Sequence, residues 1–320
     1  MAVDRNAFGF ETTTDAVLDG ISLEGRSALI TGASGGLGAE TARALAARGA
    51  AVTLTARDVE KGEAIAAAIR ESTGNANIGL GEMDLTSPDS VRSFAKGWLA
   101  SHDSLNLLIN NAGIMACPLE RTAKGWELQL ATNHLGHFLL TALLAPALVA
   151  GAPARVVNLS SGGHRFGGVD FDDLHYERRD YDKWQAYGQS KSANVLFTVE
   201  LDRRLQAKGV RSFAVHPGVI MTELARHLTP DDIKDLMDRV PGDDGMVFKP
   251  VEAGAATSCW AATAPELADR GGIYLEDCGV AEPATSDEGD HGFSPHAVDP
   301  AAAKQLWAVS EELLDVCFEI

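Results

Sequence analysis

A glycine-rich segment between a short apolar run and a helical run constrains the fold of this chain more than any other feature. The segment Thr31-Gly-Ala-Ser-Gly-Gly-Leu-Gly38 directly follows the apolar run Ser27–Ile30 and precedes residues 39–48, which have helical composition. Glycines let a backbone approach a pyrophosphate, and a helix N-terminus presents N–H groups and a partial positive charge. The order strand, glycine turn, helix therefore predicts a phosphate cradle, with a tight turn that binds no ligand as the alternative.

Similar apolar runs recur along the chain, and helical segments alternate with them. Further strands are predicted at Ala51–Thr55, Ile78–Glu82, Leu105–Ile109, Arg155–Leu159, Arg211–Val215 and Gly272–Leu275. Helices are predicted at Val59–Glu71, from a cap at Thr86 or Ser87 to about Ser101, and at about Thr122–Val149, Tyr181–Arg204, Val251–Ala264 and Ala301–Cys317. This alternation is typical of the α/β class and predicts a single-domain, Rossmann-type doubly wound parallel sheet of about seven strands with helices on both faces.

Charge and cysteine usage limit the partners of the chain. A net charge of −18 argues against nucleic acid and anionic membranes, because both require a basic surface. The four cysteines are widely scattered, which favours reduced thiols in a cytoplasmic protein over disulfides or a zinc site.

No secretion signal is evident at the N-terminus, and the apolar run Phe138–Ala150 is interpreted as a buried helix too short to span a bilayer. Asp287, Asp290 and His291 are interpreted as a solvated acidic loop, so no metal site is expected.

The end of the second strand bears on the choice of dinucleotide. In folds of this kind that strand end faces the adenosine ribose. Here it carries Ala56 and then Arg57, whose guanidinium suits a 2′-phosphate, while Asp58 is expected to cap the next helix. Ser34 is a weaker second donor to that phosphate. NADP(H) is therefore predicted in preference to NAD(H), with a plain surface role for Arg57 as the alternative.

Tyr187 and Lys191 stand four residues apart within a predicted helix and therefore share one face. A phenol ionises near pH ~10, and an adjacent ammonium lowers that pKa by favouring the phenolate. Such a pair can exchange a proton with a substrate hydroxyl or carbonyl. Asn133, a poor residue for a helix interior, suggests a further task.

Taken together, these motifs resemble those of the short-chain dehydrogenase/reductase family. The family pattern is matched over about residues 24–280 by Thr31-Gly-x-x-x-Gly-x-Gly38, Asn110-Asn-Ala-Gly113, Asn133, Ser161, Tyr187-x-x-x-Lys191 and Pro217-Gly218. Its retinol dehydrogenase-like branch is matched by Ala56-Arg-Asp-Val-Glu-Lys61, Asn133-His-Leu-Gly-His-Phe138, Phe171-Asp-Asp-Leu-His175, Ala186-Tyr-Gly-Gln-Ser-Lys191 and Ala214-Val-His-Pro-Gly-Val219. The N-terminal hydrophobic anchor of the membrane-bound animal members is not seen here.

The resemblance implies a role for each matching residue. Tyr187 would be the acid/base, Lys191 would lower its pKa and hold the nicotinamide ribose, Ser161 would orient the substrate oxygen, and Asn133 would hold a water in the proton relay. The cofactor would be held by Gly32, Ser34, Gly36, Leu37, Gly38, Arg57, Asp84, Leu85, Asn111, Ala112, Gly113, Tyr187, Lys191, Pro217, Gly218 and Thr222. Ser161 is preferred to its neighbour Ser160 because it holds the second position after the strand. His137, His164 and His216 are interpreted as structural.

The expected organisation is an N-terminal arm (1–25), a dinucleotide-binding catalytic domain (26–280) and a tail with a helix (281–320). Leu306, Val309, Leu313 and Cys317 would form one stripe of that helix, which would dock on the core or form a dimer. Within residues 219–250, turn formers at Pro230, Pro241 and Gly245 interrupt apolar residues, which favours a substrate lid over a rigid helix pair. Those apolar residues are Ile220, Leu224, Leu228, Met237, Val240, Met246, Val247 and Phe248.

The expected function is NADP(H)-dependent interconversion of a lipophilic alcohol and its aldehyde or ketone, in a homodimer or homotetramer. Two other functions are compatible with parts of the pattern. A cofactor-binding regulator would not need all four residues of the tetrad. A sugar-nucleotide epimerase or dehydratase shares Tyr-x-x-x-Lys but usually has a Gly-x-x-Gly-x-x-Gly loop.

Overall fold

A computed structural model of the chain describes residues 8–239, 247–284 and 291–318. Its centre is an eight-stranded sheet in the order β3-β2-β1-β4-β5-β6-β7-β8. The strands are β1 Ser27–Thr31, β2 Ala51–Ala56, β3 Ile78–Glu82, β4 Leu107–Asn110, β5 Ala154–Leu159, β6 Val210–His216, β7 Ile273–Glu276 and β8 Gly279–Val280. The first seven run parallel, which confirms the predicted α/β class and doubly wound sheet.

The strand count is the first correction to the sequence-based prediction. The eighth strand, β8, is only two residues long and pairs antiparallel with β7. It forms because Asp277 and Cys278 adopt positive φ angles of 48° and 56°, which reverses the chain in a tight hairpin. Periodicity cannot reveal a strand this short.

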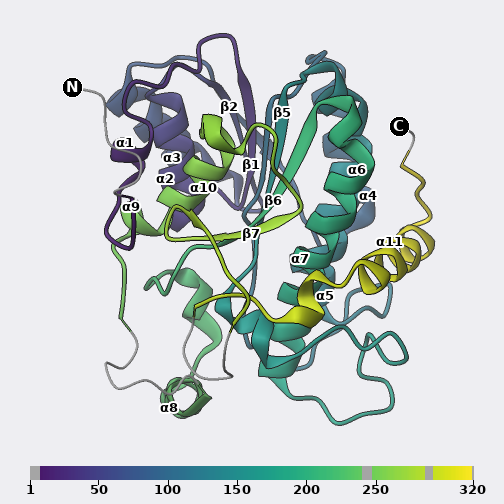
Figure 1. Cartoon of the computed structure of the whole chain (residues 1–320). Helices are drawn as coiled ribbons and strands as arrows, with labels where there is room; N and C mark the ends of the chain where they lie inside the picture. The colour runs from purple at the N-terminus through teal and green to yellow at the C-terminus, as the bar shows by residue number, and fades with distance from the viewer. Residues whose placement is uncertain (1–7, 240–246, 285–290, 319–320) are drawn as a thin grey trace.

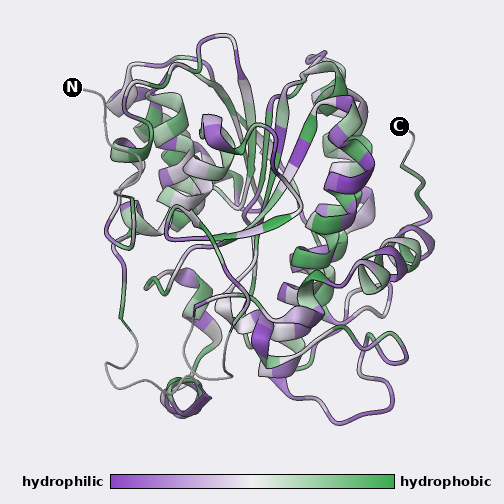
Figure 2. Cartoon of the chain, viewed as in Figure 1, coloured by the Kyte–Doolittle hydropathy of each residue, from purple (hydrophilic) through white to green (hydrophobic). Residues whose placement is uncertain are grey.

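Two layers of helices cover the two faces of the sheet, as Figure 1 shows. On one face lie α2 Gly36–Ala46, α3 Val59–Thr73, α9 Val251–Gly254 and α10 Ala256–Thr263; on the other lie α4 Pro88–Leu99, α5 Leu128–Leu130, α6 Gly136–Ala150 and α7 Lys183–Leu205. Apolar residues concentrate in the strands and on the helix faces turned toward them (Figure 2). The central strand β4 is buried at every position, as a parallel strand covered on both faces must be.

The helix predicted at about Thr122 begins later, at Leu128. Residues before it form a turn at Gly125, with φ of 82°, and a bridge between Arg121 and Glu127. The Glu127 carboxylate then accepts from the backbone N–H groups of Gln129 and Leu130 and so caps the helix start. The prediction failed here because the apolar pattern does not show which carboxylate turns inward.

The apolar segment that contains α6 is longer than the sequence analysis assumed. By length and composition, Leu128–Ala150 is long and apolar enough to cross a membrane, and it is the one such helix among the described residues. Within its most apolar window, 78% of the residues are buried inside the protein. This burial supports its interpretation as a core helix that packs against the sheet and against α4.

The closing helix α11, Pro300–Leu314, docks on α7 and the adjacent core. Its buried residues are Ala303, Leu306, Trp307, Ser310 and Leu314. Of the predicted stripe, Leu306 is buried and Leu313 packs partly buried against the core, whereas Val309 is only half-buried and Cys317 is exposed, so two of the four positions were wrong. The Trp307 ring, which packs 5.1 Å from Phe138, sets the orientation of the helix because it is the largest apolar group available to bury.

Residues 8–25 pack against the same layer as α2 and α10. The short helix α1, Thr14–Val17, is capped by Thr13, and Leu18 and Leu23 are buried in the core. The salt bridge from Arg43 of α2 to Asp15, and the hydrogen bond that the Thr14 hydroxyl donates to Glu40 of α2, reinforce the contact. The N-terminal arm is thus an integral part of the packing.

Segment 219–250 is only partly described. It contains a 3₁₀ turn at Glu223–His227 and the helix α8, Pro230–Arg239, which Figure 1 shows apart from the sheet. Pro230 opens this helix, so its effect is to start a helix and not to interrupt one. Met237, Val247 and Phe248 are about half exposed. Val240, Met246, Pro241 and Gly245 lie outside the described residues, and the lid function stays a prediction.

Candidate active site

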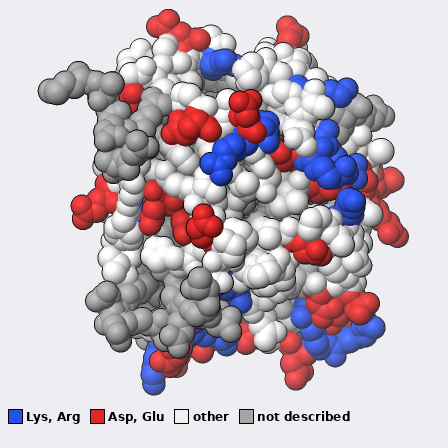
Figure 3. Space-filling view, in the orientation of Figure 1, with Lys and Arg blue, Asp and Glu red and all other residues white. Residues whose placement is uncertain are grey.

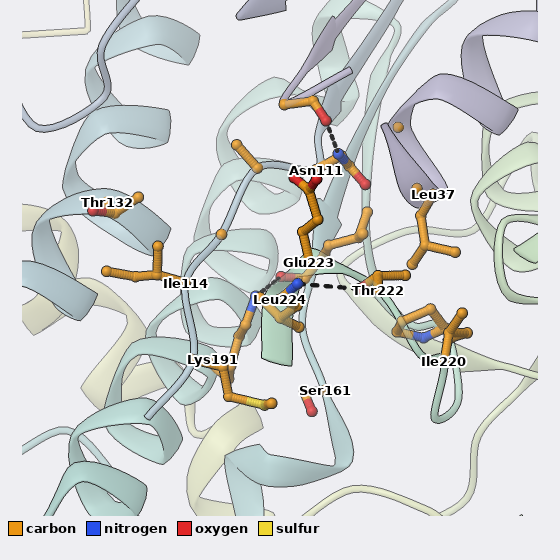
Figure 4. A pocket seen from close by; sticks show the side chains of 18 of the residues that line it. Leu37, Asn111, Ile114, Thr132, Ser161, Lys191, Ile220, Thr222, Glu223 and Leu224 are labelled. Carbon is orange, nitrogen blue, oxygen red and sulfur yellow. Dashed lines mark hydrogen bonds between the residues drawn. The ribbon is translucent and has the colours of Figure 1, made fainter. Parts of the chain in front are cut away.

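A cleft of about 960 Å³ opens at the carboxyl ends of the parallel strands. Ligands bind at this edge of open α/β sheets, where the loops after successive strands meet. It is lined by Gly32, Ser34, Gly36, Leu37, Gly38, Arg57, Asp84, Leu85, Asn111, Ala112, Gly113, Ser161, Tyr187, Lys191, Pro217, Gly218 and Thr222. These are all of the residues predicted for the site except Asn133. In Figure 4, Ile114 and Lys191 lie on one side of the cleft and Leu37, Ile220 and Thr222 on the other.

The glycine loop between β1 and α2 has the shape that a pyrophosphate requires. Gly32 and Gly36 adopt positive φ angles of 64° and 54°. A Cβ on Gly38 would lie 2.5 Å from the Asn111 side-chain nitrogen. Only glycine therefore fits at this position in the first turn of α2. The loop is held by the residue after β4, because Asn111 Nδ2 donates to the carbonyls of Thr31 at 2.7 Å and of Gly32 at 3.2 Å. These features fit a dinucleotide with its phosphates at the N-terminus of α2.

Charged groups follow β2 at the part of the cleft where the sequence predicts the adenosine ribose. Arg57 is exposed and lines the cleft, whereas the carboxylate of Asp58 accepts the backbone N–H of Lys61 at 3.0 Å and caps α3 as predicted. Lys61 itself was missed: its ammonium lies 2.5 Å from a carboxylate oxygen of Glu223, and both residues line the cleft. The spacing of four residues between Arg57 and Lys61 near the start of a helix is the signal that could have revealed it.

Tyr187, Ser161 and Lys191 meet on the floor of the cleft. Tyr187 and Lys191 lie one turn apart on α7 and are both buried. The phenol of Tyr187 is hydrogen-bonded to the side chain of Ser161. Ser160 turns the other way, because its hydroxyl donates to the main-chain carbonyl of Lys191 at 3.0 Å. Ser161 is therefore the serine that meets the phenol, as predicted from its position.

The pKa of Tyr187 moves in the direction opposite to the one expected from its neighbour. Burial raises it to about 12, and the hydrogen bond with Ser161 only partly offsets that effect. Burial also lowers the pKa of Lys191 to about 8. The Lys191 ammonium donates to the carbonyl of Leu159 at 3.0 Å and lies 5.7 Å from the Tyr187 ring centroid. Desolvation is thus the largest influence on the pKa of this phenol.

Asn133 is fully buried and does not line the cleft. It lies in a π-helical turn, Ala131–Leu135, between α5 and α6. Its side-chain oxygen accepts the backbone N–H of Ile114 at 2.9 Å, and its amide nitrogen donates to the carbonyl of Ile114 at 3.0 Å and to the hydroxyl of Ser190 at 2.9 Å. The side chain thus braces the loop after β4 against α7. Its role in a proton relay stays a prediction.

The wall beyond the tetrad contains Leu224, which was predicted for the substrate lid, together with residues that sequence reasoning missed. Met115, Phe166, Trp184, Leu224 and Leu236 present apolar surface to the cleft, accompanied by Arg165, Arg226 and Arg239. Among the missed residues, only Trp184 carried a sequence signal, because it precedes Tyr187 by three residues on one helix face. The others come from loops and from α8, whose placement depends on tertiary packing.

Of the three histidines singled out earlier, His137 and His164 are buried and hydrogen-bonded within the fold, which fits the predicted structural role, whereas His216 also lines the cleft and its role stays a prediction. His137 contacts the hydroxyl of Thr31 at 2.8 Å, and burial lowers its pKa to about 4. His164 contacts the carbonyl of Ser161 at 2.6 Å, with its pKa lowered to about 3 by burial. His216 accepts the backbone N–H of Gly162.

Metal ligands and disulfides are not found in the described part of the chain. No group of three or more potential metal ligands occurs there. Asp287 and Asp290 lie outside the described residues, and all four cysteines are free.

Comparison with known proteins gives a consistent family. A family model described as short chain dehydrogenase matches residues 26–233. Retinol dehydrogenase 12 of Homo sapiens is 45% identical over 299 residues, which cover 93% of this chain and 89% of that protein. The crystal structure of an uncharacterized protein from Mycobacterium paratuberculosis matches 95% of this chain and 98% of its own, at 38% identity and a TM-score of 0.74. The RhlG/NADP active-site complex of Pseudomonas aeruginosa matches 80% of this chain and 95% of its own, at 25% identity and a TM-score of 0.64.

Proposed function

The chain belongs to the retinol dehydrogenase-like branch of the short-chain dehydrogenase/reductase family, and we propose that it is an NADP(H)-dependent enzyme that interconverts a lipophilic primary or secondary alcohol and its aldehyde or ketone. The observation that carries this proposal is the contact between Tyr187 and Ser161 on the floor of the cleft whose opposite end holds the glycine loop. A proton donor and a dinucleotide cradle in one cleft are the two parts that carbonyl reduction needs.

In carbonyl reduction, Tyr187 would donate the proton. Burial raises the pKa of its phenol to about 12, so the hydroxyl is fully protonated at neutral pH. Ser161 and Tyr187 would both donate hydrogen bonds to the substrate oxygen, where negative charge grows as the bond to carbon forms. The bound nicotinamide would supply the hydride. Lys191, buried one turn away, would hold the nicotinamide ribose and stabilise the phenolate that remains.

The preference for NADP(H) rests on the charges at the adenosine end. Arg57 directly follows β2, and the carboxylate of Asp58 is occupied by the N-cap of α3. A 2′-phosphate would thus face a guanidinium and no free carboxylate from that turn. The glycine loop, Asp84, Leu85 and the Asn111–Gly113 turn would hold the rest of the nucleotide.

The preference for a lipophilic substrate rests on the apolar wall. Phe166, Trp184, Leu224 and Leu236 line the part of the cleft beyond Tyr187. Apolar lining with a few convergent polar groups is typical of sites for small lipophilic molecules.

The test is a panel of alcohols and carbonyl compounds of increasing chain and ring size, each assayed with NADPH or NADP⁺ and with NADH or NAD⁺. We expect turnover with NADP(H) that rises with apolar size. Cofactor binding without turnover on any compound would favour the non-catalytic regulator. Conversion of a sugar nucleotide without net consumption of cofactor would favour the epimerase or dehydratase.

For the surroundings of the enzyme, we propose a cytoplasmic homodimer or homotetramer with no nucleic-acid or membrane partner. The net charge of −18 supports the absence of anionic partners. Acidic and basic side chains are interspersed over the face in Figure 3. Light scattering tests the assembly, and fractionation of cells tests the location.

A further inference from the structure

Lys249 is a buried lysine outside the cleft, at the point where segment 219–250 rejoins the domain. Its side chain is 1% exposed and forms an ion pair with Asp277. The ammonium also lies 4.5 Å from the ring centroid of Phe10, in the N-terminal arm. A buried ammonium is costly unless it is paired, so these two contacts hold the side chain in one place.

The stem of Lys249 packs directly on the backbone of Gly218. A Cβ on Gly218 would lie 2.8 Å from Cε and 2.9 Å from Cδ of Lys249, and φ of Gly218 is 90°. The backbone N–H of Lys249 donates to the carbonyl of Val219 at 2.8 Å, next to a parallel bridge between Val219 and Phe248. Glycine at 218 is therefore required both by the backbone angle and by the lysine stem above it.

The partner of this lysine is anchored in the sheet. Asp277 stands in the tight turn between β7 and β8, where Glu276 pairs with His216 of β6. Pro217 and Gly218 follow His216 at once and line the cleft. The ion pair between Lys249 and Asp277 thus ties the turn after β6 to the turn after β7.

We propose that Lys249 is a positioning residue that, with Asp277 and Phe10, holds the turn Pro217–Val219 against the nicotinamide half of the cofactor. This inference rests on the proposed function. Lys249 is not among the residues that line the cleft, so it acts through the backbone of Gly218. A displacement of about 1 Å in a positioned group can lower its contribution to binding or catalysis ~10²-fold. A residue outside the cleft that fixes the position of this turn can therefore affect the cofactor.

The experiment compares two ligands that differ in the nicotinamide half. Binding of NADPH and of 2′,5′-ADP, which has only the adenosine half, is measured by calorimetry for the wild type, Lys249→Met and Asp277→Asn. We expect Lys249→Met to weaken NADPH at least ~10-fold and 2′,5′-ADP by less than roughly twofold, because the adenosine site is distant and independent. Asp277→Asn should act in the same direction, and Lys249→Arg should restore part of the affinity.

The control is Lys304→Met, which removes an exposed lysine from α11 and should change neither affinity. Should Lys249→Met fail to fold, Phe10→Leu tests the same contact more gently, with the same selective loss on a smaller scale. Equal loss for both ligands, or no loss for either, overturns the inference. If the wild type binds NADPH no more tightly than 2′,5′-ADP, the inference is also overturned. If the wild type binds neither ligand, the proposed function itself is overturned.

Discussion

The ammonium of Lys61 and the carboxylate of Glu223 meet at 2.5 Å across the mouth of the cleft. Their positions are 162 residues apart in the chain, and they join the helix after β2 to the turn that follows Thr222. A 2′-phosphate at Arg57 would need cationic partners in this region. On the proposed function, Glu223 would therefore compete with the 2′-phosphate of the cofactor for Lys61.

Glu223→Gln should tighten NADPH binding and leave NADH unaffected, because the variant frees Lys61 for the 2′-phosphate. The pair is largely exposed, so the gain should be modest, roughly two- to fivefold in Kd. Fluorescence titration measures both affinities. Glu60→Gln is the matched control, since it removes the same charge from the first turn of α3 without touching Lys61. Equal tightening of NADH would show that only the net charge matters.

Cofactor choice should depend on Arg57. Charge-assisted hydrogen bonds contribute roughly 1.5–3 kcal/mol, which corresponds to a preference of ~10- to 100-fold for NADP(H). Arg57→Ala should remove most of that preference, and Ala56→Asp should shift it toward NAD(H). The ratio of kcat/KM values with the two cofactors is the measurement. If the wild type prefers NADH, the interpretation of the second strand is wrong.

Turnover should require the phenol of Tyr187. Tyr187→Phe removes the proton donor but keeps the ring, so kcat should fall at least ~10²-fold while the Kd of NADPH changes only a few-fold. Steady-state rates and a binding titration separate the two effects. Near-normal turnover in this variant would exclude Tyr187 as the acid.

The two adjacent serines should differ sharply. Ser161 is hydrogen-bonded to the phenol, so Ser161→Ala should lower kcat by ~10²-fold or more. Ser160→Ala loses only a hydrogen bond to the carbonyl of Lys191 and should mainly reduce stability, by about 1 kcal/mol. Activity assays and thermal unfolding of both variants test this contrast. Similar losses of activity would mean that the cleft needs the pair as a unit.

Lys191→Met should abolish activity and raise thermal stability at pH 7. Burial lowers the pKa of Lys191 to about 8, which corresponds to a penalty of about 3 kcal/mol on the charged form. Between pH 8 and the usual pKa of a lysine, the unfolded chain binds one more proton than the folded chain. The penalty on the folded state is therefore full below pH 8 and decreases as the pH rises. The gain in Tm, a few degrees at pH 7, should therefore shrink near pH 10.

Lys249→Met provides the opposite case for the stability measurement. Its ammonium is paired with Asp277, so removal leaves a carboxylate without its partner and should lower Tm. Scanning fluorimetry of both variants at pH 7 and pH 10 compares them directly. A lower Tm for Lys191→Met at pH 7 would contradict the burial penalty.

The sequence by itself determined the parallel sheet, the glycine cradle and the pairing of Tyr187 with Lys191. These features depend on short periods: two residues in a strand, and three to four in a helix. A glycine pattern that spans eight positions is likewise complete within one local segment. The structure places Ser161 and not Ser160 beside the phenol, because successive residues of an extended segment point to opposite sides, and the catalytic role of Ser161 stays a prediction.

Only the tertiary structure decided the features that involve distant residues or solvent exclusion. The ion pair of Lys61 with Glu223 and the packing of Lys249 on Gly218 join positions far apart in the chain, so no local pattern announces them. The predicted α11 stripe was wrong at Val309 and Cys317, because the sequence alone does not show that the helix face with Trp307 and Leu314 is the one that becomes buried. The pKa of Tyr187 rose where its neighbour predicted a fall, since the cost of desolvation depends on how completely the whole fold excludes water.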